Sequence, residues 1–158
     1  ARTNAVKLGF QNVEFQEADI EDLPLADNSI DKVISNCVLN LVPDKIKAYA
    51  QIFRVLRPGG GFCISDIVTV GELPDTLRNS IEAYTGCIAG AMQQDEYLHT
   101  ISSSGFDAVK IVRSRQIPLP ENSGKSQMTK HQLAMLRSEK NGAYSITVTG
   151  RKPEVPGK

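Results

Sequence analysis

The chain has 158 residues, of which 41% are hydrophobic, which is enough for one core and too little for two ordinary domains. Its 18 Lys and Arg residues balance 18 Asp and Glu residues, so a formal net charge of zero offers no basic surplus for nucleic acid. No apolar run reaches the roughly 20 residues of a membrane span, and no signal peptide pattern opens the chain. We therefore expect a cytoplasmic protein that acts on a small molecule.

The first predicted elements are a helix end and a strand. Residues 3–9 are typical of the last turns of a helix, which Gly9 closes at its C-terminal cap. In residues 13–18 apolar and polar side chains alternate with the period of a strand, and residues 19–24 follow as a loop. Because the chain opens in mid-helix and without Met, we expect a piece of a longer polypeptide.

A strand, a helix and a second strand follow. Residues 31–35 form a short apolar strand, and strand 62–68 comes directly after the helix stop at residues 57–61. Between them, Asp44 can cap a helix with an apolar stripe. The stripe consists of Ile46, Tyr49, Phe53 and Leu56. A right-handed crossover makes the two strands parallel, which predicts an α/β fold.

The second half of the chain predicts covering helices and a closing pair of strands. One helix runs from Pro74 to about Ala91, and another begins at Asp95 and Glu96 and ends at Gly105. Two β-branched runs, one of them at 109–112 and the other at 144–149, predict an antiparallel pair.

The three cysteines are expected to be reduced thiols, because nothing in the sequence indicates export. Cys37 follows strand 31–35, at the edge where open α/β sheets place their ligands. Cys87 lies in a small-residue helical stretch, and two thiolates from separate elements make a soft site for a thiophilic ion. Any single cysteine is more often a small core residue, and Cys63, within a strand covered on both faces, is predicted to be buried.

Several segments together resemble the class I S-adenosylmethionine-dependent methyltransferases from their third strand onward. These segments are residues 12–15, 19–24, 29–36 and 54–60. Within that superfamily, residues 35–41 (SNCVLNL) and 86–91 (GCIAGA) look like the arsenite methyltransferases. The resemblance implies a Rossmann-like class I methyltransferase sheet, parallel with a closing antiparallel strand pair and lacking its first strands.

Four segments follow from this reading of the chain. Residues 1–120 would be a partial methyltransferase domain, residues 121–142 a polar connection, residues 143–151 the closing strand and residues 152–158 a loose tail. A sheet without its first strands exposes strand edges, so self-association is possible.

The resemblance implies S-adenosylmethionine as the cofactor. Asp19 would accept the adenine amino group, the amide of Ile20 would bind the ring, and Asn36 with the backbone of Cys37 would lie near the methionine part. Taken alone, an Asp-Ile pair more often begins a turn. The glycine-rich turn and the ribose-binding acidic residue of the family would lie upstream of Ala1, so the cofactor site is expected to be incomplete.

The resemblance also implies that Cys37 and Cys87 are the catalytic residues and bind trivalent arsenic as metalloid ligands. The arsenic lone pair attacks the methyl carbon in line, S-adenosylhomocysteine leaves, and the protein holds the reactants in near-attack geometry. Asp66 and Asn40 are weaker candidates, with a turn cap and a structural role as their alternatives.

The implied function is arsenite methylation in arsenic detoxification, with the isolated chain a poor catalyst. Two alternatives stay open. One is a methyltransferase that acts on a small carbon or oxygen nucleophile, with packed cysteines. The other is a non-catalytic piece that binds a metalloid or a partner chain.

Overall fold

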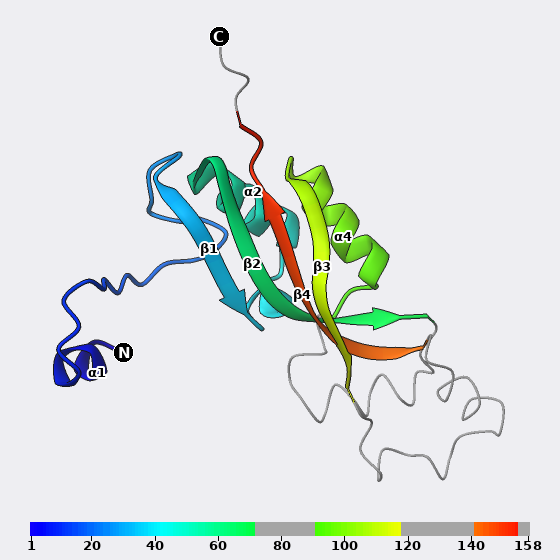
Figure 1. The fold of residues 1–158 in the computed structure, drawn as a ribbon, viewed down its shortest axis with the longest axis horizontal. Helices are drawn as coiled ribbons and strands as arrows, with labels where there is room; N and C mark the ends of the chain where they lie inside the picture. Colours follow the sequence, from blue (N-terminus) through cyan, green and yellow to red (C-terminus); the bar gives the residue numbers. More distant parts are fainter. Residues whose placement is uncertain (72–90, 118–140, 155–158) are drawn as a thin grey trace.

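The computed structural model describes residues 1–71, 91–117 and 141–154. Its described strands form one four-stranded sheet in the order β1-β2-β4-β3 (Figure 1). The strands are β1 (Ile30–Asn36), β2 (Leu56–Val70), β3 (Asp107–Gln116) and β4 (Gly142–Arg151). Strands β1 and β2 are parallel, and β4 runs antiparallel to both β2 and β3. The predicted mixed α/β sheet with its closing antiparallel pair is therefore confirmed.

The described helices are short and the two longest lie on one face of the sheet. They are α1 (Arg2–Lys7), the 3-10 turn η1 (Leu39–Leu41), α2 (Lys45–Val55) and α4 (Gln94–Ser103). Figure 1 shows α2 and α4 behind the sheet. None of the described helices is long and apolar enough to cross a membrane. The helix predicted at 74–91 lies outside the described residues, apart from Ala91.

Local sequence signals explain where the helices begin and end. The Asp44 carboxylate accepts a hydrogen bond from the Lys47 amide (2.9 Å), which caps α2 as predicted. After α1, Gly9 adopts a φ of 72°, which glycine tolerates without a Cβ clash. The amides of Gly9 and Phe10 then bond the carbonyls of Val6 and Ala5 in a Schellman arrangement.

The core lies between the sheet and the helices α2 and α4. Phe62, Ile64 and Val148 point into it from the strands, and Tyr49 and Tyr97 enter it from α2 and α4. Aromatic edges pack there, with 6.1 Å between the ring centroids of the two tyrosines. One member of the predicted stripe on α2 is wrong: Ile46 is 69% exposed, because α2 turns the face bearing Tyr49 toward the sheet instead.

The other face of the sheet is not covered by any helix that the structure describes. Ile34 is 84% exposed on this face, Val112 is 52% exposed, and Cys63 is exposed between them. The prediction that Cys63 is buried is therefore wrong. That prediction assumed that the strands of a parallel sheet are covered on both faces. In the structure, the described helices α2 and α4 lie on one face only.

The strand predicted at 13–18 is also wrong, since these residues form no regular element. Val13 and Phe15 are 47% and 38% exposed, respectively. A strand needs a neighbour for its amide and carbonyl groups, and β1 ends the sheet on this side without pairing to residues 13–18. Only an isolated bridge between Asp19 and Asp22 follows in this part of the chain.

Candidate functional site

A shallow hollow brings two of the predicted cofactor residues close to the end of β1. Its volume is about 560 Å³, and Asp19, Ile20 and Val38 line it together with Glu17 and Ala18. Val38 directly follows the predicted ligand Cys37. The loop before β1 and the turn after it thus share one surface, although they lie far apart in sequence.

The Asp19 carboxylate takes part in a turn. Its Oδ1 accepts a hydrogen bond from the Glu21 amide (2.9 Å), and the Asp22 amide donates to the Asp19 carbonyl (3.0 Å). The local turn that an Asp-Ile pair favours is present. Within the described residues no hydrogen bond reaches Oδ2 of Asp19, so one carboxylate oxygen faces solvent beside the hollow.

Cys37 has a left-handed backbone at the carboxyl end of β1. Its φ is 54°, an uncommon value for a residue other than glycine, and its amide donates to the Ser65 carbonyl at 2.8 Å. The side chain is half-buried. This conformation turns the chain from β1 into the 3-10 turn η1, and it places the thiol at the sheet edge that the sequence predicts.

Asn36 belongs to a different hollow. It lies opposite Ser65 in the sheet and lines a depression of about 440 Å³ on the uncovered face, together with Thr147, Arg113 and Arg115. The structure therefore brings Asp19 and Ile20 together beside Val38 but does not place Asn36 in the same hollow. Cys87 lies outside the described residues, as do residues 121–140 of the predicted polar connection.

A chain of buried hydrogen bonds runs from the helices to the strand beside Cys37. The Tyr49 hydroxyl donates to the Tyr97 oxygen (2.7 Å), and the Tyr97 hydroxyl donates to Oδ2 of Asp66 (2.9 Å). Asp66 is 1% exposed. Burial raises its pKa to about 6, against the lowering effects of the Tyr97 and Asn40 hydrogen bonds and the Lys45 charge. Burial is also the main reason why the pKa values of both tyrosines are raised.

Sequence reasoning assigned Tyr97 only to a covering helix and did not link it to Asp66. A usable signal was present, because a tyrosine at a core position of a helix needs an acceptor for its hydroxyl. A carboxylate at the end of a neighbouring buried strand is the obvious acceptor in this sequence.

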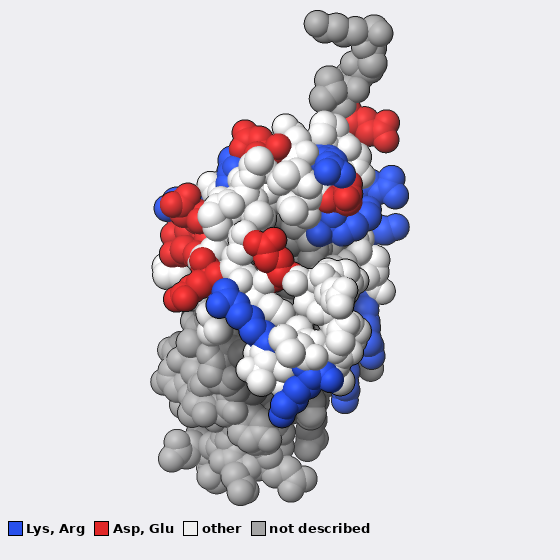
Figure 2. Space-filling model, turned by 90° about the vertical axis from the view of Figure 1, so that its left-hand side faces the viewer, with Lys and Arg blue, Asp and Glu red and all other residues white. Residues whose placement is uncertain are grey.

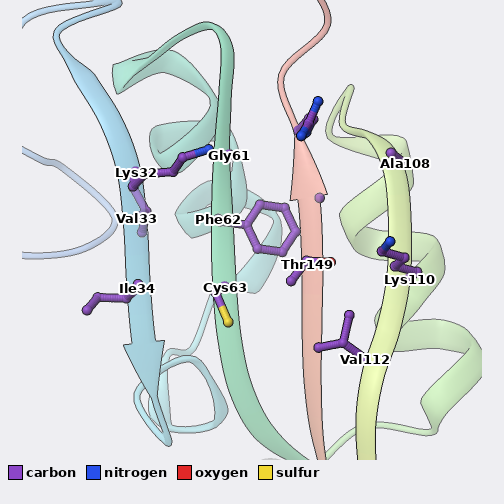
Figure 3. Close-up of a pocket in the computed structure, with 12 residues that line it drawn as sticks. Lys32, Val33, Ile34, Gly61, Phe62, Cys63, Ala108, Lys110, Val112 and Thr149 are labelled. Atoms are coloured by element: carbon purple, nitrogen blue, oxygen red, sulfur yellow. The ribbon is translucent and has the colours of Figure 1, made fainter.

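The uncovered face of the sheet carries a third hollow, of about 550 Å³ (Figure 3). One row of side chains crosses the sheet there, with Ile34 opposite Cys63, Cys63 opposite Thr149, and Thr149 opposite Lys110. Lys32 and Val112 flank this row in the close-up. In residues 1–71, 91–117 and 141–154, no group of three or more His, Cys, Asp or Glu side chains could hold a metal ion.

Charged side chains on the β1 side of the molecule carry both signs. Figure 2 shows acidic side chains mainly on the left of this view and Lys and Arg side chains mainly on the right, with both signs mixed between them. Close pairs join them across elements, with 2.6 Å between Arg54 and Asp27 and 2.6 Å between Arg57 and Asp31. These pairs tie the end of α2 and the start of β2 to the loop and strand beside them.

Comparison with known proteins identifies the family. A family model described as a methyltransferase domain matches residues 1–105. The chain belongs to this methyltransferase family.

Among curated relatives, this methyltransferase chain is 44% identical to the arsenite methyltransferase of Halobacterium salinarum over 111 residues, which is 70% of this chain and 28% of that protein. It is 37% identical to the human arsenite methyltransferase over 118 residues, which is 72% of this chain and 32% of that protein. The chain thus spans about a third of the length of these relatives. The resemblance to arsenite methyltransferases is confirmed.

A solved structure leads to the same family. The chain matches an arsenic(III) S-adenosylmethionine methyltransferase from Chlamydomonas reinhardtii with a TM-score of 0.66 and 31% identity, over 98% of this chain and 49% of that one. The class I methyltransferase fold is therefore confirmed for this methyltransferase chain.

Proposed function

We propose that this chain is part of an arsenite methyltransferase, which transfers a methyl group from S-adenosylmethionine to trivalent arsenic bound by Cys37 and Cys87. The similarity to arsenite methyltransferases supports the substrate. The observation that carries the proposal is the position of Cys37, at the carboxyl end of β1 and one residue before the hollow that Asp19 and Ile20 line.

The hollow beside Val38 fits the adenosine end of S-adenosylmethionine. Its volume of about 560 Å³ lies within the usual range for small-molecule sites. Asp19 offers an acceptor for the adenine amino group through Oδ2, and Ile20 offers an amide and an apolar side chain for the ring. When bound, the cofactor supplies an electrophilic methyl group.

The protein residues act mainly by binding and orienting. Trivalent arsenic is a soft substrate that prefers thiolates, so Cys37 and Cys87 would hold it after losing their protons. Substrate capture should therefore release protons to solvent. A thiolate on a fixed backbone restricts the motion of the arsenic and so favours near-attack geometry.

We also propose that the chain is one portion of a longer methyltransferase. It spans about a third of its curated relatives, and β1 ends the described sheet with an unpaired outer edge. The isolated chain would then be a poor catalyst, and its exposed sheet edge would allow self-association. The division at residues 120, 142 and 151 stays a prediction, although Lys152, the first residue of the predicted tail, hydrogen-bonds to the Gly60 carbonyl.

The test is titration of the reduced chain with phenylarsine oxide, followed by thiolate absorbance. Cys37→Ser and Cys87→Ser should each abolish binding of one equivalent, whereas the matched control Cys63→Ser should retain it. Absence of binding, or binding that survives both substitutions, would contradict the arsenic site. A methyltransferase with a carbon or oxygen nucleophile would then be the better account.

A further inference from the structure

A row of polar side chains crosses the uncovered face of the sheet at the carboxyl ends of β1 and β2. Asn36 of β1 lies opposite Ser65 of β2. Ser65 in turn lies opposite Thr147 of β4, which lies opposite Arg113 of β3. The Ser65 and Thr147 hydroxyls are 2.8 Å apart. The row therefore lies at the edge where open α/β sheets bind their ligands.

A β-bulge in β3 brings two arginines to this row. The register of β3 against β4 shifts between Ile111 and Arg113, so Val112 is an extra residue in β3. Ile111 packs against the core, and strict alternation would point residue 113 to the core as well. After the bulge, Arg113 and Arg115 both line the hollow of about 440 Å³ on the uncovered face. Bulges re-aim side chains in this way beside functional sites.

This hollow offers hydrogen-bond donors and positive charge. Arg113 and Arg115 are its charged lining residues, and neither of them forms an ion pair within residues 1–71, 91–117 and 141–154. A guanidinium presents a planar fork of N–H groups that matches a carboxylate or a phosphate, and hydroxyls can donate to the same oxygens. The polar lining residues with hydroxyl or amide side chains are Asn36, Ser65, Gln116, Ser145 and Thr147.

Protection of the sheet edge does not explain this arrangement. Strand β3 lies at the edge of the described sheet, and charges on an edge strand oppose pairing with another chain. That role needs no polar residue at Ser65, which lies on the interior strand β2. In the neighbouring row, β1 and β2 carry Ile34 and Cys63 instead. The polar side chains are thus gathered where the two arginines face the sheet.

We propose that this hollow binds an oxyanion, namely the carboxylate or phosphate group of a small molecule. The Arg113 and Arg115 guanidiniums would hold the anion together with the hydroxyls of β2 and β4, and we call the site the arginine hollow. Its volume leaves room for the body of a small molecule beside the anionic group. The arginine hollow is separate from the hollow beside Val38, so this inference goes beyond the proposed function and does not depend on arsenic binding.

The test is calorimetric titration of the full chain with phenyl phosphate and with benzoate, which share a ring and differ in the anionic group. Benzamide, the neutral analogue of benzoate, is the control ligand. We expect at least one of the two anions to bind saturably with one equivalent, and the tighter one shows whether the site prefers phosphate or carboxylate. Absence of saturable binding for both anions, or equally tight binding of benzamide, would overturn the proposal.

Three variants that each lose one positive charge locate the binding. Arg113→Gln and Arg115→Gln should each weaken anion binding by roughly tenfold, the effect of losing about one charge-assisted hydrogen bond. Arg151→Gln is the matched control, because Arg151 lines the neighbouring hollow, and it should change binding by less than about twofold at physiological salt. All three side chains are exposed, so the variants should fold. Equal losses in the three variants would mean that the anion responds only to total charge, and the proposal would be wrong.

Two conservative variants test the geometry of the site. Arg113→Lys keeps the charge but loses the planar fork, so it should weaken binding severalfold. Thr147→Val removes one hydroxyl and should weaken binding by about threefold. Titration with the anion that the wild type binds more tightly measures both effects. An unchanged affinity in either variant would contradict an oxyanion site built from these groups.

Discussion

On the face of the sheet that α2 and α4 cover, Ile64, Ile146 and Val148 are completely buried, whereas Ile34 on the opposite face is largely exposed. All four are β-branched residues in strands of the same sheet. Their composition indicates strands because such side chains suit a pleated surface. The composition does not indicate which face of the sheet is buried, because burial depends on where the helices pack.

The two faces also differ in how they use polar groups. The covered face contains the buried carboxylate of Asp66, whose Oδ2 accepts the Tyr97 hydroxyl inside the core. The uncovered face contains exposed basic side chains, among them Lys110 and Arg113, beside the hollows. Buried polar groups need partners, whereas exposed ones are satisfied by water. Substitutions on the two faces should therefore differ strongly in their effect on stability.

The largest difference is expected between two isoleucines. Ile64→Ala should lower the free energy of unfolding by about 2–5 kcal/mol, because it removes buried methyl groups and leaves a cavity. Ile34→Ala should change it by less than about 0.5 kcal/mol, because water already contacts the side chain. Urea unfolding measures both values. A cost above about 1 kcal/mol for Ile34→Ala that grows with protein concentration would instead mean that a second copy covers this face.

The next difference concerns pH and Asp66. The pKa of this carboxyl group is raised from 3.8 to about 6 in the folded chain. Between pH 3.8 and about pH 6 the folded chain keeps a proton on Asp66 that the unfolded chain has lost. The stability that protonated Asp66 contributes is therefore complete below about pH 4 and is lost as the pH rises to about 6. At about 1.4 kcal/mol for each pKa unit, the change is at most roughly 3 kcal/mol.

Unfolding free energies of the wild type and Asp66→Asn, measured from pH 4 to pH 7, check this expectation. The difference between the two proteins should shift in favour of the variant up to about pH 6 and then stay constant, because Asn does not titrate. A difference that does not depend on pH would show that Asp66 is ionised throughout this range.

How far the sequence could predict this structure depends on the range of the interactions. The cap at Asp44, the stop at Gly9 and the parallel pairing of β1 with β2 follow from local patterns and were predicted. The strand at 13–18 and the burial of Cys63 were predicted wrongly, because each requires a neighbouring strand or helix that the sequence pattern does not show. The alternation of apolar and polar side chains does not show whether a partner strand is present or which face of the sheet a helix covers.

The candidate site divides in the same way. The position of Cys37 at the end of β1 follows from the strand before it, and the sequence predicts it. No local pattern encodes its left-handed φ of 54° or the bond between Asp66 and Tyr97, which joins residues 31 apart in the sequence. Asn36 and Asp19 were expected at opposite ends of one cofactor site, and they line different hollows, with Asn36 beside Ser65 on the uncovered face.

A smaller effect is expected where the sheet is tied to its covering helix. The Lys152 ammonium donates to the Phe53 and Leu56 carbonyls at the end of α2 and to Asn28, at 2.8 to 2.9 Å. Lys152→Met should cost about 1–2 kcal/mol, because carbonyls at the helix end lose a charged donor. Lys110→Met on the uncovered face is the matched control and should stay within about 0.5 kcal/mol. Thermal unfolding of the two variants compares them, and equal losses would contradict a specific tie at α2.

The smallest effect on stability is expected at Cys63, and there reactivity is the sharper measure. Cys63→Ser should change the unfolding free energy by less than about 0.5 kcal/mol, because the thiol lies on the uncovered face. In the folded chain this exposed thiol should react with a disulfide reagent faster than the half-buried thiol of Cys37, since access limits the attack. The serine variant should lose one equivalent of the fast phase. If the fast phase is unchanged, Cys63 is covered in solution and the contrast between the two faces does not hold.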